Sequence, residues 1–345
     1  MNKNIDITTF FNLAITIPVI DVRSPGEFDN AHFPGAINLP LFNNDERRQV
    51  GICYKEKGRD DAIILGLELV GPKMGELAKM AKSLAIDGKL VVHCWRGGMR
   101  SLSMAWLMNL AGIETYTLVG GYKTYRRYLK KYFENKFNLV VLGGMTGSGK
   151  TEILKEIKKL GEQVLDLEKL ANHKGSAFGA LGQEEQVSTE QFENNLFKEL
   201  SNFDYNKLIW LEDESQTIGK IRIPSEFFLQ MRSAQVIKII QPLNDRIKWL
   251  VKEYGQFDKE LLKMSIEKIK KRLGGLVCKQ AIDALENSDF EMVADIVLAY
   301  YDKTYSYGLS TRDNKKIHEL QLDKMDFAEN AKAAVHFFSK LSTFF

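Results

Sequence analysis

The chain has few cysteines and little net charge, and each shortage excludes a class of protein. Its 345 residues include only Cys53, Cys94 and Cys278, an odd and widely spaced set that excludes a disulfide framework and indicates a reducing compartment. Lysine and arginine exceed aspartate and glutamate by three, so the chain is no global polycation. A nucleic-acid surface would have to come from local clusters of basic residues.

Long apolar runs are also missing. FFNLAITIPVI, residues 10–20, is too short to span a bilayer, lacks a basic flank with a cleavage pattern, and is followed by Asp21. We therefore expect a cytoplasmic protein with no membrane partner. The sequence has no internal repeat and no low-complexity tract, and its 44% apolar content is enough for the packed cores of about two domains.

Two strand-loop-helix patterns organise the chain. In the first part, short β-branched runs such as KLVVHCW alternate with helical stretches, which predicts an α/β domain over residues 1–137, ending in a basic connector helix at 123–137. In the second part, four strand-like runs predict a parallel-sheet P-loop domain over residues 138–345. From about residue 243 this domain becomes helical and rich in lysine. The strand-like runs are FNLVVLGG, QVLDLEKL, KLIWLEDES and SAQVIKIIQP.

The second domain begins with an anion-binding pattern. Gly144, four residues, and then Gly149-Lys150-Thr151 fit G-x-x-x-x-G-K-[ST] between a strand and a helix. Glycines let the backbone amides converge on a phosphate, and the helix N-terminus and Lys150 add positive charge. The cradle does not distinguish a nucleoside triphosphate from another diphosphate. The predicted diphosphate-binding residues are Gly144, Met145, Thr146, Gly147, Ser148, Gly149, Lys150 and Thr151.

An acidic segment follows a later strand of the same domain. WLEDES places Glu212 and Asp213 at the end of an apolar run, where an acid can hold magnesium or its water opposite Thr151. A solvated acidic turn is the alternative. Thr151 and Asp213 are the candidate magnesium ligands, and we expect no tightly bound cofactor.

Cys94 stands at the tip of the strand KLVVH and opens a loop that contains glycines. Amide donors, the start of the following helix, and Arg96 and Arg100 all favour a thiolate there. We therefore predict that Cys94, Arg96 and Arg100 are catalytic, together with Lys150. A small buried hydrophobic residue at a strand end is the alternative for Cys94, and it is the favoured interpretation of the other two cysteines.

The stretch IDVRSPGEFDNAHFPGAINLPL, residues 20–41, resembles the opening of rhodanese-like domains. The resemblance implies supporting roles for Asp21 and Arg23. Cys94 and Arg100 are separated by five residues, whereas the usual sulfurtransferase loop has four between its cysteine and its arginine. HCWRGGMRS also fits the H-C-x5-R-[ST] form of cysteine phosphatases. A loop sized for a tetrahedral anion would also suit selenophosphate.

The union of the two domains resembles the tRNA 2-selenouridine synthases, and LDLEKLANHKGSAFG, residues 165–179, is similar to a stretch of that family. The resemblance implies conversion of wobble 2-thiouridine in tRNA to 2-selenouridine through S-geranyl-2-thiouridine, with geranyl diphosphate and selenophosphate as substrates. The resemblance also implies that Cys94 takes part in the transfer of selenium, in one version of the mechanism by carrying it as a transient selenosulfide on its sulfur. Where the family usually has arginine, this chain has Lys174, which keeps the charge and loses the bidentate geometry. The residues assigned to the diphosphate or uridine pocket are His173, Lys174, Ser176, Glu212, Asp213 and Arg222.

Two basic stretches are candidate tRNA surfaces, because phosphate contacts supply most of the sequence-independent affinity for RNA. Residues 246–279 carry ten basic residues against four acidic ones, with aromatic residues between them, and the connector helix adds a second cluster. Ordinary amphipathic helices with solvated lysine faces are the alternative. The predicted tRNA-binding residues are Arg126, Arg127, Lys130, Lys131, Arg246, Lys248, Lys270, Lys271 and Arg272.

Two other functions fit parts of the sequence. A P-loop kinase or ATPase fused to a rhodanese-like sulfurtransferase or a cysteine-phosphatase-like domain would turn over nucleotide without RNA. A binding module without catalysis would hold RNA even if Cys94 and Lys150 were replaced.

Overall fold

The computed structural model describes residues 2–342, and its internal contacts group the chain into two compact units. Unit 1 runs to Tyr132 and takes in Glu193–Asn195, whereas unit 2 comprises Phe133–Phe192 and the chain from Leu196 onward. The sequence analysis placed a domain boundary after residue 137. None of the helices in the described chain is both long enough and apolar enough to cross a bilayer.

Unit 1 contains a five-stranded sheet in the order β1-β5-β4-β2-β3, with every neighbouring pair parallel. Four of the five residues of β4 are buried, which explains the apolar run from Leu90 to Val92 at its centre. Parallel pairing brings the carboxyl ends of β2, β4 and β5 to one edge of the sheet. The strands are β1 (Lys3–Ile5), β2 (Val19–Asp21), β3 (Ile37–Asn38), β4 (Lys89–His93) and β5 (Glu114–Leu118).

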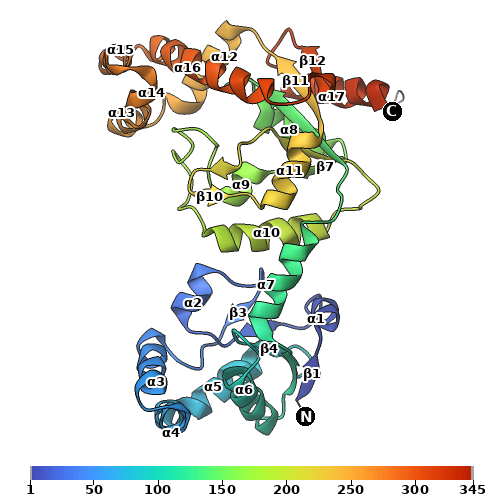
Figure 1. The fold of residues 1–345 in the computed structure, drawn as a ribbon, viewed down its shortest axis with the longest axis vertical. Coiled ribbons are helices and arrows are strands. Elements are labelled where there is room, and N and C mark those ends of the chain that lie inside the picture. Colours follow the sequence, from blue (N-terminus) through green and yellow to red (C-terminus); the bar gives the residue numbers. More distant parts are fainter. Residues whose placement is uncertain (1, 343–345) are drawn as a thin grey trace. The chain divides into compact units, whose positions relative to one another are not determined.

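The helices of unit 1 connect these strands (Figure 1). Local capping fixes some of their starts: Asn43 and Glu46 form a capping box, each accepting a hydrogen bond from the backbone N–H of the other, at 2.8 Å. Ile20, Val92 and Met104 lie at the centre of the core. The helices are α1 (Ile7–Leu13), α2 (Pro25–Asn30), α3 (Asn44–Glu56), α4 (Arg59–Val70), α5 (Met74–Leu84), α6 (Met99–Leu110) and α7 (Gly121–Tyr132), with a 3-10 turn at Gly71–Lys73.

The connector predicted over residues 123–137 is helical only as α7, which ends at Tyr132. Beyond that point the side chain of Gln230 replaces the helical hydrogen bonds. Its Nε2 donates to the carbonyls of Phe133 (3.1 Å) and Asn135 (2.9 Å), and its Oε1 accepts from the backbone N–H of Phe137 (3.0 Å).

Unit 2 contains a second five-stranded parallel sheet, in the order β12-β11-β6-β8-β7, which confirms the predicted P-loop-type α/β architecture. The carboxyl ends of β6, β7 and β8 are neighbours at one edge, the usual place for a ligand site in an open parallel sheet. The strands are β6 (Leu139–Gly144), β7 (Gln163–Leu165), β8 (Ile209–Glu212), β11 (Gln235–Ile240) and β12 (Ile317–Gln321), and a separate antiparallel pair consists of β9 (Thr217–Ile218) and β10 (Ile221–Arg222).

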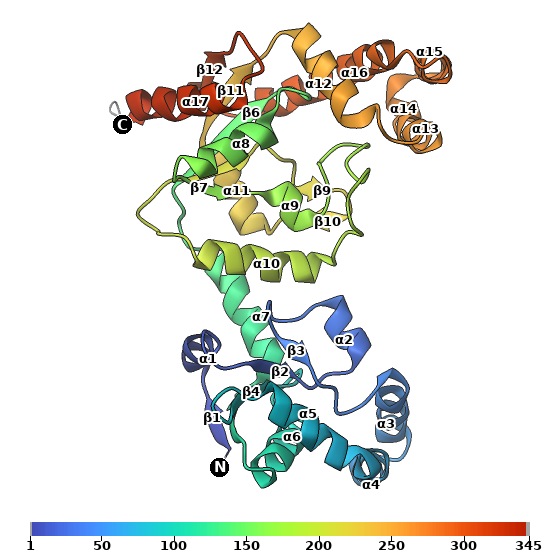
Figure 2. The same cartoon turned by 180° about the vertical axis from the view of Figure 1, so that it is seen from behind.

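Most of unit 2 after residue 243 is helical, as predicted, and Figure 2 shows these helices from behind. A second core forms between them, around Phe178, Ile266 and Cys278, so Cys278 is a buried structural residue. The helices are α8 (Lys150–Lys159), α9 (Leu167–Ala171), α10 (Thr189–Ser201), α11 (Ser225–Ser233), α12 (Leu243–Tyr254), α13 (Lys259–Lys268), α14 (Lys270–Leu273), α15 (Gly275–Glu286), α16 (Phe290–Ser310) and α17 (Phe327–Ser342), with a 3-10 turn at Asn314–Lys316.

Two local expectations for unit 2 were wrong. The run QVLDLEKL is a strand only as β7, because Asp166 accepts a hydrogen bond from the N–H of Lys169 and so starts α9. The lysine-rich region also contains the strand β12, which pairs with β11 at the edge of the sheet. IHELQ is only partly buried, so its composition gave no clear strand signal.

Candidate active sites of the two units

The glycine-rich loop of unit 2 leaves the carboxyl end of β6 and enters α8. Gly147 and Gly149 have φ angles of 78° and 77°, a region that favours glycine. A Cβ on Gly149 would lie 2.5 Å from the ring of Phe327, and one on Gly144 would lie 2.6 Å from the side chain of Ile239. Backbone angles and close packing therefore both require glycine, and the loop can present its main chain at the start of α8.

Lys150 turns back onto its own loop. Its Nζ donates to the carbonyl oxygen of Gly144 at 2.8 Å and lies 3.4 Å from that of Met145. Burial lowers the pKa of Lys150, and the negative charges of Glu168 and Glu214 oppose that shift. A diphosphate oxygen is a stronger acceptor than a carbonyl, so Lys150 is available to exchange one for the other.

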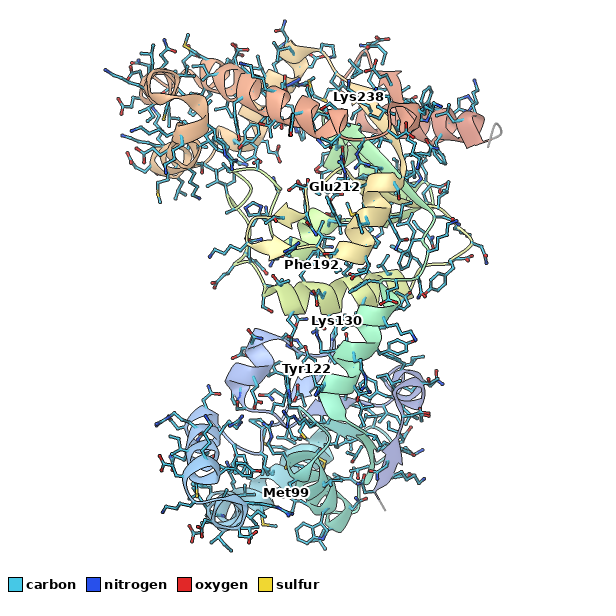
Figure 3. All side chains as sticks on the ribbon, in the orientation of Figure 1. Met99, Tyr122, Lys130, Phe192, Glu212 and Lys238 are labelled. Atoms are coloured by element: carbon cyan, nitrogen blue, oxygen red, sulfur yellow. The ribbon has the colours of Figure 1, made fainter. Side chains whose placement is uncertain are left out.

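Three glutamates surround the start of α8. The Thr151 hydroxyl donates to Glu168 Oε2 at 3.0 Å, and the backbone N–H of Glu168 donates to Glu212 Oε1 at 2.9 Å. Burial, followed by the charge of Glu168, raises the pKa of Glu214 to about 8. Burial and the neighbouring carboxylates also raise the pKa of Glu212 well above its ordinary value. Figure 3 labels Glu212 at the end of β8.

Asp213 does not lie free beside Thr151, where it was predicted as a magnesium ligand. It pairs with Arg312 at 2.5 Å, and both side chains are almost fully buried. Within residues 2–342 no group of three or more His, Cys, Asp or Glu is placed to hold a metal ion. Thr151, Glu168 and Glu212 supply the hard oxygen atoms that magnesium prefers, so the magnesium site stays a prediction, with different acids beside Thr151.

The loop opens into a cavity of about 950 Å³ that combines a charged floor with an aromatic wall. The Tyr305 hydroxyl accepts a hydrogen bond from the backbone N–H of Gly144 at 2.6 Å, and the Tyr301 hydroxyl accepts one from that of Ala177 at 2.9 Å. α16 is thereby tied to the phosphate loop and to the segment after α9. The wall residues are Trp249, Leu250, Tyr254, Ile269, Tyr300, Tyr301, Tyr305 and Leu309.

His173, Lys174 and Ser176 line this same cavity. The His173 ring packs so closely on Gly179 that a Cβ there would lie 2.8 Å from it. Burial, followed by the charge of Lys268, lowers the pKa of His173, which favours the neutral form of its ring. Lys174 pairs with Glu253 at 2.5 Å. Arg222 differs from these residues: it is exposed on β10 and does not line the cavity.

In unit 1, Cys94 follows β4 directly and is 3% exposed. Its Sγ lies 3.3 Å from the hydroxyl oxygen of Ser101, which also donates to the carbonyl of Gly98 at 3.0 Å. Gly121, with φ of 57°, lies so close that a Cβ there would be 2.3 Å from the carbonyl oxygen of Cys94. Contact with the turn after β5 therefore fixes the loop.

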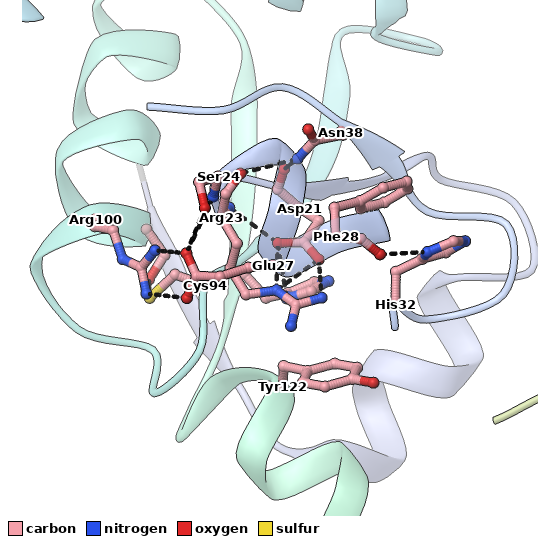
Figure 4. A network of polar contacts seen from close by, with 12 residues as sticks. Asp21, Arg23, Ser24, Glu27, Phe28, His32, Asn38, Cys94, Arg100 and Tyr122 are labelled. Atoms are coloured by element: carbon pink, nitrogen blue, oxygen red, sulfur yellow. Dashed lines mark hydrogen bonds and ion pairs between the residues drawn. The ribbon is translucent and has the colours of Figure 1, made fainter. Parts of the chain in front are cut away.

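Arg100 is oriented by Glu27, as Figure 4 shows. Its Nη1 donates to Glu27 Oε2 at 2.6 Å and its Nη2 to Oε1 at 3.2 Å. Burial raises the pKa of Glu27, but the hydrogen bond and charge of Arg100 outweigh that effect and lower it. Arg96 is exposed. Cys94, Arg96 and Arg100 line a second cavity, of about 840 Å³, in which an anion at the loop would compete with Glu27 for Arg100.

The supporting residues of the rhodanese-like opening lie beneath this loop (Figure 4). Arg23 donates to Asp21 through Nε at 2.9 Å and Nη2 at 2.6 Å, and it lies 4.0 Å from the centre of the Tyr122 ring. Asn38 Nδ2 donates to the carbonyls of both residues at 2.9 Å. Asp21 and Arg23 are almost inaccessible, so they support the structure and do not contact substrate.

Two residues predicted to bind tRNA are buried. Arg126 hydrogen-bonds to Asn194 at 2.6 Å and pairs with Glu193. Arg246 pairs with Asp302 at 2.8 Å. These partners occupy both guanidinium groups, so neither faces solvent. The others are exposed, and Lys271 and Arg272 line the phosphate cavity; the exposed set is Arg127, Lys130, Lys131, Lys248, Lys270, Lys271 and Arg272.

Sequence reasoning missed several residues of both sites. Ser101 had a signal, because it fills the last position of the H-C-x5-R-[ST] pattern. Glu168 had a weaker one, because it lies just after β7, at the ligand edge of a parallel sheet. Tyr305 and Arg312 had none, because only the fold of α16 and the residues after it brings them to the loop.

Comparison with known proteins covers both units. A family model described as the AAA domain of tRNA 2-selenouridine synthase matches residues 137–333, and one for the rhodanese-like domain matches residues 11–128. The tRNA 2-selenouridine synthase of Bordetella petrii is 35% identical over 331 residues, which cover 84% of this chain and 86% of the relative. That of Shewanella denitrificans is 33% identical, covering 86% and 90%, and that of Hydrogenovibrio crunogenus is 35% identical, covering 94% and 96%.

Proposed function

The chain belongs to the tRNA 2-selenouridine synthase family, and from this premise we propose that it is a transferase that modifies tRNA. The modification converts wobble 2-thiouridine to 2-selenouridine through S-geranyl-2-thiouridine, with geranyl diphosphate and selenophosphate as co-substrates. The observation that carries the proposal is that one chain of this family holds two separate anion loops, one with Lys150 and one with Cys94.

The first half-reaction uses the cavity of unit 2. The thiocarbonyl sulfur attacks C1 of geranyl diphosphate, the carbon–oxygen bond breaks, and the diphosphate leaves with the electron pair. Lys150 and the loop amides stabilise the charge that develops on it. The neutral His173 ring accepts the proton that leaves N3 of the base. The aromatic wall supports a prenyl chain as ligand, because it offers apolar contact beside a diphosphate cradle.

Magnesium, if bound, would neutralise part of the diphosphate charge, with Thr151 and Glu212 as the residues to hold it. The raised pKa of Glu214, about 8, supports diphosphate binding. A carboxyl group that is protonated at neutral pH repels an incoming diphosphate less than an ionised one would.

The second half-reaction uses the Cys94 loop. S-alkylation turns the sulfur into a leaving group. Hydrolysis of selenophosphate yields phosphate and hydrogen selenide, which adds to C2. Geranyl thiol departs with one proton, N3 regains the other, and no atom changes oxidation state. Arg100 and the loop amides bind the selenophosphate anion, and Cys94 lies at the floor of that loop.

One experiment tests the whole proposal. RNA that contains 2-thiouridine is incubated with geranyl diphosphate, with selenophosphate, or with both, and the mass of the nucleoside is measured. We expect the S-geranyl nucleoside with the first and 2-selenouridine only with both. Lys150→Ala should block the first product, and Cys94→Ser should let the S-geranyl nucleoside accumulate.

The rival functions give other outcomes. A P-loop kinase or ATPase would hydrolyse nucleotide at the same rate with and without tRNA and leave the nucleoside mass unchanged. A binding module would retain RNA in both variants and also leave the mass unchanged. Either result would refute the proposed transferase activity.

A further inference from the structure

The cavity beside Cys94 is lined mostly by apolar side chains, which binding an inorganic anion does not require. They come from the segment before α3, from α3 and from α4, and α6 contributes Met99. Charged residues, including Arg47 and Arg59, also line it. The apolar and aromatic residues include Phe42, Val50, Tyr54, Ile63, Leu67 and Trp95.

The two ends of this cavity suit different chemistry. At one end the sulfur of Cys94 and the pair of Arg100 with Glu27 suit an anion and a polar base. Elsewhere α4 contributes Ile63 and Leu67, and Leu67 is 63% exposed although it lines a cavity. Tyr54 and Met99, which line the same cavity, are also exposed, by 57% and 52%, and a group of exposed apolar side chains in one hollow is typical of a ligand-binding groove. The volume of about 840 Å³ lies within the range of small-molecule sites.

We propose that this cavity binds the prenyl chain of the S-alkylated uridine while selenium replaces the sulfur, an inference that rests on the proposed function. The substrate of the second half-reaction carries its alkyl chain on the sulfur that leaves. A reaction centre at Cys94 therefore needs an apolar space directly beside it. Holding the chain there aims C2 at the anion loop and selects alkylated over unalkylated 2-thiouridine.

Selenium transfer beside this cavity follows the second half-reaction. Selenium bonds to C2, the bond from C2 to sulfur breaks, and the prenyl thiol leaves with a proton. The thiol product has the same chain as the substrate, so the same apolar wall holds it until it dissociates. Alkyl chains of different length should then react at different rates, because each buried methylene adds to binding.

The test compares RNA with S-geranyl-2-thiouridine and RNA with S-methyl-2-thiouridine, each supplied with selenophosphate. We expect kcat/KM for the geranyl substrate to be at least about tenfold higher, which corresponds to about 1.4 kcal/mol. In Leu67→Glu that preference should largely disappear through loss of the geranyl rate, while the methyl rate changes less than about twofold. Geranylation of 2-thiouridine by unit 2 should stay at the wild-type rate.

Ile64→Glu is the matched control. Ile64 lies on the same helix and is 57% exposed, but it does not line the cavity. The Ile64→Glu variant should therefore prefer the S-geranyl over the S-methyl substrate as strongly as the wild type does. Leu67→Ala provides a second variant without a charge, and thermal unfolding of each variant shows that it is folded. We expect Leu67→Ala to lose less of the preference for the S-geranyl substrate than Leu67→Glu does.

Failure of this inference is distinct from failure of the proposed function. If wild-type protein makes no 2-selenouridine from either substrate, the function is wrong. If it converts both equally well, or if Ile64→Glu loses as much preference as Leu67→Glu, the function stands and the prenyl pocket is wrong. If Leu67→Glu instead changes the molecular mass by light scattering, Leu67 belongs to an interface between copies of the chain, which also overturns the pocket.

Discussion

At the scale of single residues, the hydroxyl of Ser101 holds the Cys94 sulfur in place. It lies 3.3 Å from Sγ and is itself fixed by the Gly98 carbonyl. We predict that Ser101→Ala slows formation of 2-selenouridine from S-geranyl RNA about tenfold, the value of one hydrogen bond of about 1.4 kcal/mol. Ser101→Thr keeps the hydroxyl and should retain most of the rate. A slowed geranylation step in Ser101→Ala would contradict this, because the proposed function places that step in unit 2.

Glu214 sets a pH dependence in unit 2. Its pKa of about 8 lies above its ordinary value of 4.5, so the folded state binds this proton more tightly than the unfolded chain does. The stabilisation is complete below about pH 4.5 and is lost as the pH rises through about 8. We predict that the free energy of unfolding falls by about 1–2 kcal/mol between roughly pH 6 and pH 9, less than the full shift would give, because the mostly buried side chain still has some contact with water.

The variant Glu214→Gln should flatten that decline, because the amide does not titrate. It should also keep its affinity for inorganic diphosphate above pH 8, where the wild type develops a negative charge beside Lys150. Calorimetric titration at several pH values measures the affinity, and thermal unfolding measures the stability. An unchanged decline in Glu214→Gln would mean that another group titrates.

At the scale of elements, the pair of Arg246 and Asp302 joins α12 to α16 beside the phosphate loop. Arg246 also donates to the carbonyl of Thr146 at 3.1 Å, so one side chain holds both helices and the loop. We predict that Arg246→Ala lowers the free energy of unfolding by about 3 kcal/mol, because it leaves Asp302 without its cation. Lys271→Ala is the control, since Lys271 is exposed and should not affect stability.

The same two variants should differ in tRNA binding as well, but here we expect Lys271→Ala to change the binding and Arg246→Ala to leave its salt dependence unchanged. If Lys271 contacts a tRNA phosphate, Lys271→Ala should reduce the magnitude of the slope by about 0.7–0.9 when the logarithm of the tRNA binding constant is plotted against the logarithm of the salt concentration. Arg246→Ala, measured at a temperature where it is folded, should keep the wild-type slope. An Arg246→Ala variant that is fully stable and has a reduced slope would restore Arg246 as an RNA contact.

The same elements show how much sequence alone could predict. Local chemistry was enough where a motif and its structural context lie together, as in β6, the glycine loop and α8, or in β4 and the Cys94 loop. It failed for Arg246, because arginine is rarely buried and its partner Asp302 lies 56 residues away. The aromatic wall was missed for a related reason: Tyr301 and Tyr305 look like ordinary helix residues until α16 packs beside the loop.

At the scale of the whole molecule, the proposed function assigns one half-reaction to each of the two units. Each unit has its own core and its own cavity. A variant that lacks one half-reaction should therefore keep the other at its full rate. This independence makes it possible to ask whether the S-geranyl RNA must stay on one molecule between the two steps.

We predict that a mixture of Cys94→Ser and Lys150→Ala protein makes 2-selenouridine with a lag, because S-geranyl RNA made by the first variant must dissociate and bind the second. Excess unmodified tRNA should suppress the mixture strongly, since it competes for rebinding, and the wild type much less. Nucleoside masses over time measure both effects. If the competitor slows wild type and mixture equally, the intermediate is released between steps. If the mixture makes no 2-selenouridine while each variant keeps its own half-reaction, the intermediate never leaves the protein that made it.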